Sequence, residues 1–420
     1  MHKKKIVIIG GGPAGMMAAI CSAALDQEVI LIEKNERLGK KLLISGHGRC
    51  NVTNSEEGPA FLKHYFKKGN FLRDAFKRFS NKDLIDYLHS HGVGLKTEDN
   101  GRVLPVSNKA SSIVEALQAD LKKNKATVLL NAAVKRVRVR NGRVYDVELD
   151  KGQYVTADAV IVATGGMTYP RTGSDGKFFK TLKNVGHTVV PLRPALVPLE
   201  IEAWPGMVLS GVSLADCIVS TTDSDGSKHT SRGAIIFTHW GMSGPAILSI
   251  SRFVAETVQG KGSASISLDL IPGETEEAVR AWLLAQKDEH PQSLVKNILS
   301  RKVPKSVGEF MLTALSIEHE KKCSEISKKD INKLGQALKR NEWRVKRCRP
   351  NNEAMVTQGG VSLKEIDPKT MGSRLIKGLF FAGEMIDIDG DSGGYNIQLA
   401  FSTGYLAGGS AIHVEARHEK

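Results

Sequence analysis

The sequence predicts an α/β protein in which a parallel β-sheet covered by helices is interrupted by an inserted region. A β-branched run at residues 5–9 leads directly into a glycine-rich turn and then into small apolar residues. Apolar runs at 159–163 and 378–382 also end in glycine turns. Between residues 194 and 355 the patterning changes to short strands followed by a polar helical stretch. Sheet elements on both sides of a differently patterned region predict a discontinuous domain with an insert.

The first elements of the chain have the order that a dinucleotide-binding βαβ unit needs. The run at 5–9 predicts a strand, the small residues at 16–24 a helix, and the apolar run at 29–32 a second strand. The turn after the first strand contains Gly10, Gly12, Pro13, Ala14 and Gly15. A glycine turn that only packs a helix on a strand is the alternative, but the complete βαβ context favours nucleotide binding.

The glycines of this turn have separate physical roles. Gly10 lets the chain leave the strand sharply, Gly12 has no side chain to block a pyrophosphate, and Gly15 lets the helix pack closely on the sheet. The helix N-terminus offers free N–H groups and partial positive charge to the phosphates. Glu33 ends the second strand, where a carboxylate can accept hydrogen bonds from both ribose hydroxyls. Because that charge would repel a 2′-phosphate, FAD or NAD fits better than NADP.

Hydrophobic periodicity predicts the remaining elements of this domain. The expected helices are 61–91, 111–123 and 394–407. The expected strands beyond the first unit are 127–130, 133–140, 143–149, 159–163 and 378–382. Asn141-Gly142 supplies a two-residue hairpin turn.

We therefore expect a Rossmann-like domain made of residues 1–193 and 356–420, interrupted by an insert at 194–355. Within the insert, residues 194–272 are expected to be rich in β-strands and residues 273–345 to be helical, polar and basic. The expected strands of the insert are 208–212, 215–220, 233–237 and 263–270.

Composition limits the class of protein. A chain of 420 residues with 41% apolar and 25% charged residues is typical of a globular protein with two or three domains. No apolar stretch is long enough for a membrane span. The five cysteines are scattered singly without a CxxC motif, which argues against a dithiol redox centre and against zinc, so no metal is expected. An odd, sparse set favours a reducing compartment, and we expect a cytoplasmic protein.

The formal net charge is +14, and its densest clusters are 122–125, 135–140 and 344–349. These clusters fit either a nucleic-acid surface or a solvated basic surface that attracts anionic cofactors and substrates. Because aromatic residues do not alternate with the charges, the second interpretation is favoured and nucleic-acid binding is the alternative.

Three separated glycine turns follow predicted buried strands, at 10–15, 165–166 and 383–384. In an open parallel sheet, ligands gather at the carboxyl ends of the strands, so three turns at one edge would form one extended groove. A second complete GxGxxG is absent. This combination favours one tightly but non-covalently held dinucleotide, the pattern of a flavoprotein.

Several sequence strings resemble known flavoproteins. Residues 8–15 with Glu33-Lys34 resemble the FAD end of glutathione-reductase-like flavoproteins, and 163–176 is similar to the fumarate-reductase branch. Residues 46–54, 237–245 and 381–398 resemble the BaiN-like family, also labelled aminoacetone oxidase-like, nearly end to end. The resemblance implies FAD, a discontinuous Rossmann-like domain, and an insert with a β part and a helical part. Members are assigned either reduction of conjugated enones in steroid-like substrates or oxidation of small aminoketones.

The resemblance also implies which residues hold FAD. The expected cofactor residues are Gly10, Gly12, Pro13, Ala14, Gly15, Glu33, Lys34, Lys41, Ser45, Gly46, Arg49, Cys50, Asn51, Val134, Thr164, Gly165, Gly383, Glu384, Gly394, Tyr395, Asn396 and Ile397. Glu384 should reach the ribitol or pyrophosphate region, although it could instead cap the last helix. Cys50 is expected beside the flavin without thiol chemistry. The opening of the last helix, at 394–397, should face the flavin N1–O2 locus, where negative charge develops on reduction.

Four residues are candidates for the substrate side: His239, Tyr395, Tyr169 and Arg171. His239 could shuttle a proton near neutral pH or be an ordinary hydrogen-bonded histidine. Tyr395 could donate a proton or simply pack. Arg171 could bind an anionic or carbonyl group of the substrate, or pair with a surface acid.

The sequence favours an FAD-dependent oxidoreductase in which NADH or NADPH visits transiently to reduce the flavin. The expected substrate is a conjugated, enone-type carbonyl compound of small size. The alternatives are an oxygen-using oxidase of a small aminoketone, a nucleic-acid (tRNA)-binding flavoprotein, and an NAD-binding protein without flavin. No signal for an oligomeric state is present.

Overall fold

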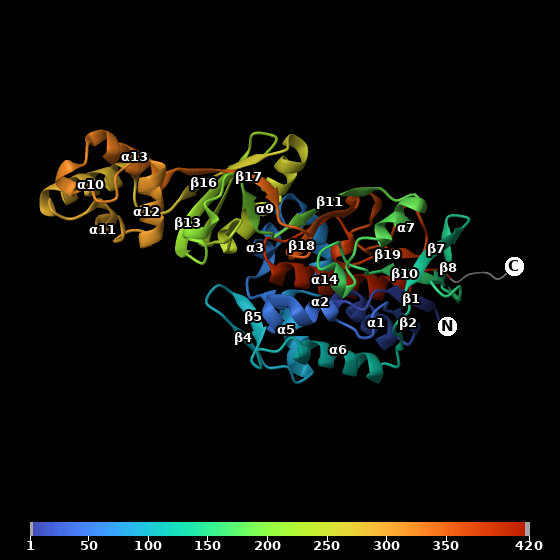
Figure 1. Cartoon of the computed structure of the whole chain (residues 1–420). Helices are drawn as coiled ribbons and strands as arrows, with labels where there is room; N and C mark the ends of the chain where they lie inside the picture. Colours follow the sequence, from blue (N-terminus) through green and yellow to red (C-terminus); the bar gives the residue numbers. More distant parts are fainter. Residues whose placement is uncertain (1–2, 416–420) are drawn as a thin grey trace. The chain divides into compact units, whose positions relative to one another are not determined.

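The computed structural model describes residues 3–415, and the chain divides into two compact units (Figure 1). Unit 1 combines the chain up to Leu192 with the chain from Met355 onward. Unit 2 is Arg193–Ala354. None of the helices within residues 3–415 is both long and apolar enough to cross a membrane.

Unit 1 is built on a five-stranded sheet with the strand order β19-β10-β1-β2-β6. Its strands are β1 (Lys5–Ile9), β2 (Glu28–Ile32), β6 (Thr127–Leu129), β10 (Ala159–Val162) and β19 (Leu379–Phe381). Every neighbouring pair is parallel. The apolar side chains of β1 and β10 are buried, as expected of parallel strands covered on both faces. The predicted α/β fold with a discontinuous Rossmann-like domain is confirmed.

Two helices from opposite ends of the chain, α1 (Pro13–Ala24) and α14 (Gly393–Ala411), pack directly on each other. A Cβ on Gly404 would lie 2.3 Å from the backbone oxygen of Ala14, and one on Gly408 would lie 2.5 Å from that of Ala18. The two glycines are therefore required for this close approach. Since positions 404 and 408 meet positions 14 and 18 in the same order, the two helices run in the same direction.

The other helices of unit 1 are α2 (Lys40–Ile44), α3 (Gly58–Lys63), α4 (Arg73–Arg78), α5 (Asn81–Ser90), α6 (Ser111–Lys123) and α7 (Phe178–Asn184). Of these, α6 packs on α1, and α4 and α5 contact α14. Short 3₁₀ segments are η1 (Ser45–Gly48), η2 (Phe66–Leu72), η3 (Pro170–Thr172), η5 (Leu363–Glu365) and η6 (Gly383–Met385).

The continuous helix expected over 61–91 is wrong, because the segment is divided into α3, η2, α4 and α5. Gly69 in η2 lies so close to the preceding turn that a Cβ would be 2.0 Å from the Leu62 oxygen. A new helix then begins at α5, where Ser80 and Asp83 form a capping box.

Three small sheets complete unit 1. Two are antiparallel and three-stranded, with the orders β3-β5-β4 and β7-β8-β9. Their strands are β3 (Thr53–Asn54), β4 (Leu95–Thr97), β5 (Arg102–Pro105), β7 (Val134–Arg140), β8 (Arg143–Leu149) and β9 (Tyr154–Thr156). The third pairs β11 (Val189–Ala195) with β18 (Val356–Val361).

Unit 2 contains a closed antiparallel barrel with the order β12-β15-β14-β13-β16-β17, in which β17 also pairs with β12. Its strands are β12 (Leu199–Ile201), β13 (Ser213–Thr222), β14 (Lys228–Phe237), β15 (Gly241–Ser243), β16 (Ala264–Asp269) and β17 (Asn341–Cys348). The helices α8 (Gly206–Leu209) and α9 (Pro245–Lys261) belong to the same part of the chain.

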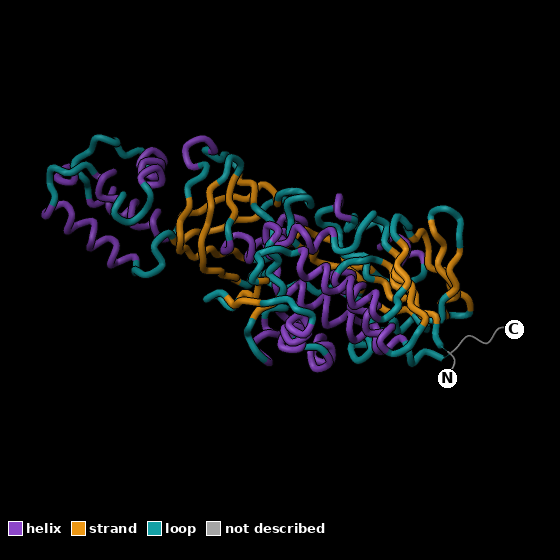
Figure 2. Tube along the Cα trace, turned by 90° about the horizontal axis from the view of Figure 1, so that it is seen from below, coloured by secondary structure: helices purple, strands orange, loops and turns teal. Residues whose placement is uncertain are grey.

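A separate helical group follows the barrel strand β16, and Figure 2 distinguishes it clearly from the strands. Its helices are α10 (Glu276–Glu289), α11 (Val295–Leu299), α12 (Lys305–Ala314), α13 (Lys328–Lys339) and the 3₁₀ segment η4 (Cys323–Glu325). The strand expected at 208–212 is wrong, since α8 occupies its first residues. The helical expectation to residue 345 is also wrong, because β17 begins at Asn341 and closes the barrel.

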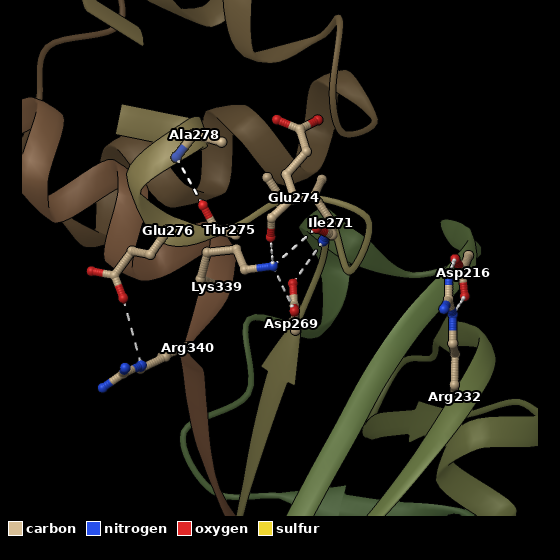
Figure 3. Close-up of polar contacts among 10 residues, drawn as sticks. All are labelled: Asp216, Arg232, Asp269, Ile271, Glu274, Thr275, Glu276, Ala278, Lys339 and Arg340. Atoms are coloured by element: carbon tan, nitrogen blue, oxygen red, sulfur yellow. Dashed lines mark hydrogen bonds and ion pairs between the residues drawn. The ribbon is translucent and has the colours of Figure 1, made fainter. Parts of the chain in front are cut away.

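Lys339 ties the helical group to the barrel at the point where the chain passes between them (Figure 3). Its ammonium donates hydrogen bonds to Asp269 Oδ2 at 2.7 Å and to the backbone oxygen of Ile271 at 3.0 Å. A third bond goes to the backbone oxygen of Glu274. One partly buried cation therefore satisfies three acceptors where β16 leads toward α10.

Candidate active site

The three glycine turns lie at one edge of the unit 1 sheet. The strands β19, β10 and β1 are parallel neighbours, so their carboxyl ends are adjacent. Gly10 has a φ of 105°, and a Cβ there would lie 2.5 Å from the Ala163 oxygen. Gly383 has a φ of 70°, and a Cβ there would lie 2.9 Å from the Cβ of Ala14. The turns thus form one continuous edge that side chains would obstruct.

The opening of α1, by which we mean its N-terminal first turn, is arranged to receive an anion. Gly12 is the N-cap and provides no side-chain cap, Pro13 takes the first helical position, and a Cβ on Gly12 would meet open space. Gly15 differs, because a Cβ there would lie 1.8 Å from the Gly10 oxygen. The first turn therefore presents backbone N–H groups without a side-chain partner beside an open space.

Glu33 lies against this turn and is buried. Its Oε2 accepts a hydrogen bond from the Gly11 amide at 2.7 Å, and its Oε1 accepts from the Asn35 amide at 2.8 Å. Next to it, Lys34 forms an ion pair with Asp175 at 3.1 Å. The side-chain amide of Asn35 also donates to Oε1, at 2.6 Å, so that oxygen accepts two hydrogen bonds. Hydrogen bonds thus fix the carboxylate beside the glycine turn, and Oε2, which accepts one, keeps a lone pair for a ligand hydroxyl.

Lys41 and Glu384 meet although 343 positions separate them in the sequence. The Lys41 Nζ lies 2.8 Å from Glu384 Oε2 and 2.7 Å from the hydroxyl of Thr168. The other carboxylate oxygen of Glu384 accepts a hydrogen bond from the Thr357 amide at 2.6 Å. Glu384 does not cap the last helix, which has Ser392 as its N-cap. Thr168 and Thr357 were not identified from the sequence, because only the pairing across the sheet edge reveals them.

The opening of α14 is also free of a side-chain cap. A Cβ on Gly393 would meet open space, whereas one on Gly394 would lie 2.8 Å from Asn51 Nδ2. Asn51 Oδ1 and Thr53 Oγ1 are buried and have no hydrogen-bond partner within residues 3–415. Buried polar atoms are rarely left unpaired, so these two atoms point to a polar ligand at this place.

The two helix openings are separated along a common direction. Because Gly404 lies against Ala14, the first residue of α1 is level with about position 403 of α14, which begins at Gly393. At about 1.5 Å of rise per residue, the opening of α14 projects about 15 Å beyond that of α1. A ligand that contacts both openings must be extended, as a dinucleotide is.

The segment that connects α2 to Asn51 has an unusual backbone. Gly46 and Cys50 have φ values of 56° and 58°, and the Ser45 hydroxyl donates to the Leu42 oxygen. Cys50 is completely buried, and burial raises the pKa of its thiol to about 12. The thiol is therefore neutral at physiological pH and lacks the thiolate that redox exchange requires. Arg49 pairs with Glu98, 3.5 Å away.

Three further expected residues lie around the same sheet edge. Val134 begins β7, in a segment where the Ala132 amide donates to the Glu33 oxygen at 3.1 Å. The Thr164 hydroxyl contacts the sulfur of Met385 at 2.9 Å. Gly165, with a φ of 75°, would place a Cβ 2.9 Å from the hydroxyl of Ser174, whose oxygen is buried without a partner in the described chain.

Tyr395 points its ring into an aromatic cluster. The ring meets Phe61 edge-on with centroids 4.7 Å apart, and its hydroxyl donates to Glu56 Oε2 at 3.1 Å. The Tyr395 backbone oxygen accepts from the hydroxyl of Tyr65 at 2.7 Å. Burial and the Glu56 carboxylate raise the pKa of the phenol, so it stays protonated. Its neighbours Asn396 and Ile397 are half-buried, and Asn396 bonds the Gly390 loop.

The other substrate-side candidates lie in different places. Tyr169 has a φ of 53° and precedes η3, which carries the exposed Arg171. Both belong to unit 1, as Tyr395 does. His239 belongs to unit 2, where it is exposed on the turn between β14 and β15.

Comparison with known proteins gives the family. The HI0933-like protein Rossmann domain matches residues 4–410. This chain belongs to the HI0933-like family. The resemblance inferred from the sequence strings is thereby confirmed, and the HI0933-like chain is an FAD-dependent oxidoreductase.

Individual proteins resemble this HI0933-like chain over nearly its whole length. A protein of Clostridium scindens named 3-dehydro-bile acid delta(4,6)-reductase is 31% identical, covering 97% of this chain and 98% of its own. A protein of Haemophilus influenzae named ribosomal RNA dihydrouridine synthase is 32% identical, covering 95% and 96%. The crystal structure of 3-ketosteroid delta1-dehydrogenase from Sterolibacterium denitrificans has a TM-score of 0.54 at 12% identity, covering 99% and 100%. That last likeness concerns the fold alone.

Proposed function

We propose that this flavoprotein reduces a carbon–carbon double bond conjugated to a carbonyl, with NADH or NADPH as the transient reductant. FAD, when bound, supplies the hydride chemistry. The observation that carries this proposal is the uncapped opening of α14 beside the unpaired Asn51 Oδ1. The positive end of a helix dipole stabilises negative charge, so this opening favours the reduced, anionic state of a ring placed there.

Within this proposal the chain's own residues hold the cofactor at separate points. The amides at Gly12 and the following turn bind the pyrophosphate, and Glu33 accepts from the adenosine ribose. Lys41, held by Glu384 and Thr168, contributes positive charge near the ribitol phosphate. Substrate reduction then requires a proton at the carbon next to the carbonyl, for which Tyr395, Tyr169, Arg171 and His239 are the candidates.

The test is the behaviour of the flavin absorbance in anaerobic stopped-flow experiments. We expect rapid bleaching by NADH or NADPH and rapid recolouring on addition of a 3-keto-4-ene steroid. Slow recolouring by the enone together with rapid recolouring and peroxide release in air would support the oxidase alternative and contradict the proposal. If neither NADH nor NADPH bleached the flavin, the proposal that a nicotinamide is the reductant would be wrong.

A second candidate substrate is the uracil ring of an RNA. The Haemophilus influenzae relative is named for the synthesis of dihydrouridine in ribosomal RNA, and the C5–C6 double bond of uridine is also conjugated to a carbonyl. The same hydride and proton addition would therefore serve a steroid-like enone or a uridine. Mass spectrometry of nucleosides, after incubation of RNA with enzyme and reductant, tests this candidate by the gain of two hydrogens on uridine.

A further inference from the structure

The segment from α3 to α4 carries a dense set of exposed cations. Residues 61–79 contain six Lys or Arg residues and a single acid, Asp74. Five of these cations are exposed: Lys63, Lys67, Arg73, Lys77 and Arg78. None of the five makes an ion pair or a side-chain hydrogen bond with another residue of the described range 3–415. Their charge is therefore available to an external anion.

The basic clusters most visible in the sequence differ, because acids neutralise much of their charge. On β8, Glu148 lies 3.5 Å from Lys135 and 3.2 Å from Arg136. On β12, Glu200 contacts Arg347 at 2.7 Å and Arg349 at 3.4 Å. Such cross-strand pairs leave less net charge for a partner than the count of basic residues indicates.

The third sequence cluster, at 122–125, is also free of ion pairs but lies elsewhere. Lys122 and Lys123 are in the last turn of α6, where cations offset the helix dipole. This cluster provides three exposed lysines, Lys122, Lys123 and Lys125, at the end of a helix that packs on α1 and α2.

The segment 61–79 is bonded directly to the opening of α14. The Tyr65 hydroxyl donates to the Tyr395 oxygen, and His64 Nδ1 lies 2.6 Å from Asp391 Oδ2, just before the N-cap. Lys68, the paired cation of the segment, contacts Asp387 at 2.6 Å. The five free cations therefore lie on the segment that is bonded to the opening of α14, where we expect the flavin.

The chemistry of the segment selects among anionic partners. Its aromatic rings pack inward, with Phe61 and Phe76 centroids 5.1 Å apart, so they are not free to stack on bases. None of the large apolar side chains from residue 57 to 82 is exposed, so the segment lacks the apolar anchors of a membrane-surface helix. Cations without either feature suit a phosphate backbone.

We propose that Lys63, Lys67, Arg73, Lys77 and Arg78 bind the phosphate backbone of an RNA beside the cofactor site. The proposal rests on the second candidate function, in which a uridine of RNA is the substrate. The contacts are electrostatic and independent of base sequence. Contacts with five phosphates give a slope of about −3.5 when log K is plotted against log salt for a single strand.

The test is fluorescence anisotropy of a labelled oligouridylate with the FAD-loaded full chain at several salt concentrations. The variant Lys63→Gln, Lys67→Gln, Lys77→Gln should lose at least about tenfold in affinity at low salt and about 2 from the slope. The matched control is Lys122→Gln, Lys123→Gln, Lys125→Gln, which removes the same charge elsewhere and should stay within about twofold of wild type. Unchanged flavin spectra and melting temperatures show that both variants are folded.

If both triple variants lost the same RNA affinity, binding would depend on the net charge of the protein and not on this surface, which would overturn the proposal. So would no RNA binding at the lowest salt, or binding to phosphatidylserine vesicles that the first triple abolishes while RNA affinity is unchanged. RNA binding that depends on the first triple supports the surface even if no dihydrouridine forms. In that case the RNA substrate is wrong, while the assignment of the surface holds.

Discussion

His64 stacks face to face on Tyr395, with ring centroids 4.0 Å apart and planes 10° from parallel. Its two ring nitrogens contact two carboxylates, with Nδ1 2.6 Å from Asp391 and Nε2 2.5 Å from Glu56. Burial alone would lower the pKa of His64, but the hydrogen bonds and charges of both acids raise it above its ordinary value. The imidazole of His64 therefore joins the end of the loop before α14 to the segment before α3, and the two acids favour its protonated form.

This arrangement predicts a pH-dependent contribution to stability. Because the folded-state pKa of His64 is raised, its contribution is complete below about pH 6.5 and is lost as pH rises through the raised pKa. In thermal melts, His64→Gln should therefore be least stable relative to wild type near about pH 6, with the difference shrinking toward about pH 9. A difference that is constant across this range would contradict the role of the charge.

The pKa of His187 shifts in the opposite direction to that of His64. Burial lowers its pKa despite the nearby Glu365, and its ring also bonds Ser373. A lowered pKa stabilises the fold above about pH 6.5 and loses that effect as pH falls through the folded value. The stability deficit of His187→Gln should therefore shrink toward low pH, where that of His64→Gln is greatest.

The pair Lys41–Glu384 predicts a coupled effect on cofactor binding and stability. Lys41→Met leaves the largely buried Glu384 carboxylate without its cation, which should cost about 1–3 kcal/mol and weaken FAD binding. Titration of the apoprotein with FAD and urea melts measure the two effects. Lys40→Met is the control, since Lys40 pairs with the exposed Glu36 and its loss should change stability much less than the loss of Lys41. Equal effects of the two substitutions would contradict a special role for Lys41.

The close contact between α1 and α14 predicts a strong response to one added methyl group. Gly404→Ala places a Cβ 2.3 Å from the Ala14 oxygen, which cannot move without shifting α1. Such overpacking costs about 1–3 kcal/mol, and it should lower FAD affinity if, as we propose, both helix openings contact the cofactor. Gly409→Ala is the matched control, as its Cβ would meet nothing closer than Cys21 Sγ at 3.6 Å. Urea melts that rank the two variants equally would refute this packing argument.

The hydrogen bonds of Lys339 predict how strongly the helical group and the barrel of unit 2 are connected. In Lys339→Met, Asp269 and two backbone oxygens lose their shared donor, so we expect a loss of about 1–3 kcal/mol. Arg232→Met is the control, because the pair of Arg232 with Asp216, also drawn in Figure 3, is exposed and should contribute much less than the bonds of Lys339. Hydrogen exchange should show faster opening of the α13–β17 junction in the first variant alone.

Local patterns predicted elements well where burial has a clear period. The helix expected at 111–123 and the strand expected at 143–149 agree with α6 and β8. At 208–212 the apolar run indicated a strand, but Pro205-Gly206 begins a short helix there. The charged strand β17 resembles the helical stretch before it, and only its pairing with β12 and β16 identifies it.

The same limit applies to the site. The glycine turn and Glu33 are close in sequence, so one local motif predicts them together. The contacts of Lys41 with Glu384 and of Glu384 with Thr357 join distant segments, and no local spacing reveals them. The sequence does not single out the free cations of 63–78, because a count of charges does not distinguish paired from unpaired side chains.

The packing of α14 on α1 has a consequence for biosynthesis. A ribosome releases the first βαβ unit early, but the last strand of the sheet, β19, and the helix α14 emerge after residue 378. Until then Gly404 has not been synthesised, so the face of α1 that carries Ala14 and Ala18 is not covered by α14. The contact between α1 and α14 can therefore form only after the barrel and the helical group have been synthesised.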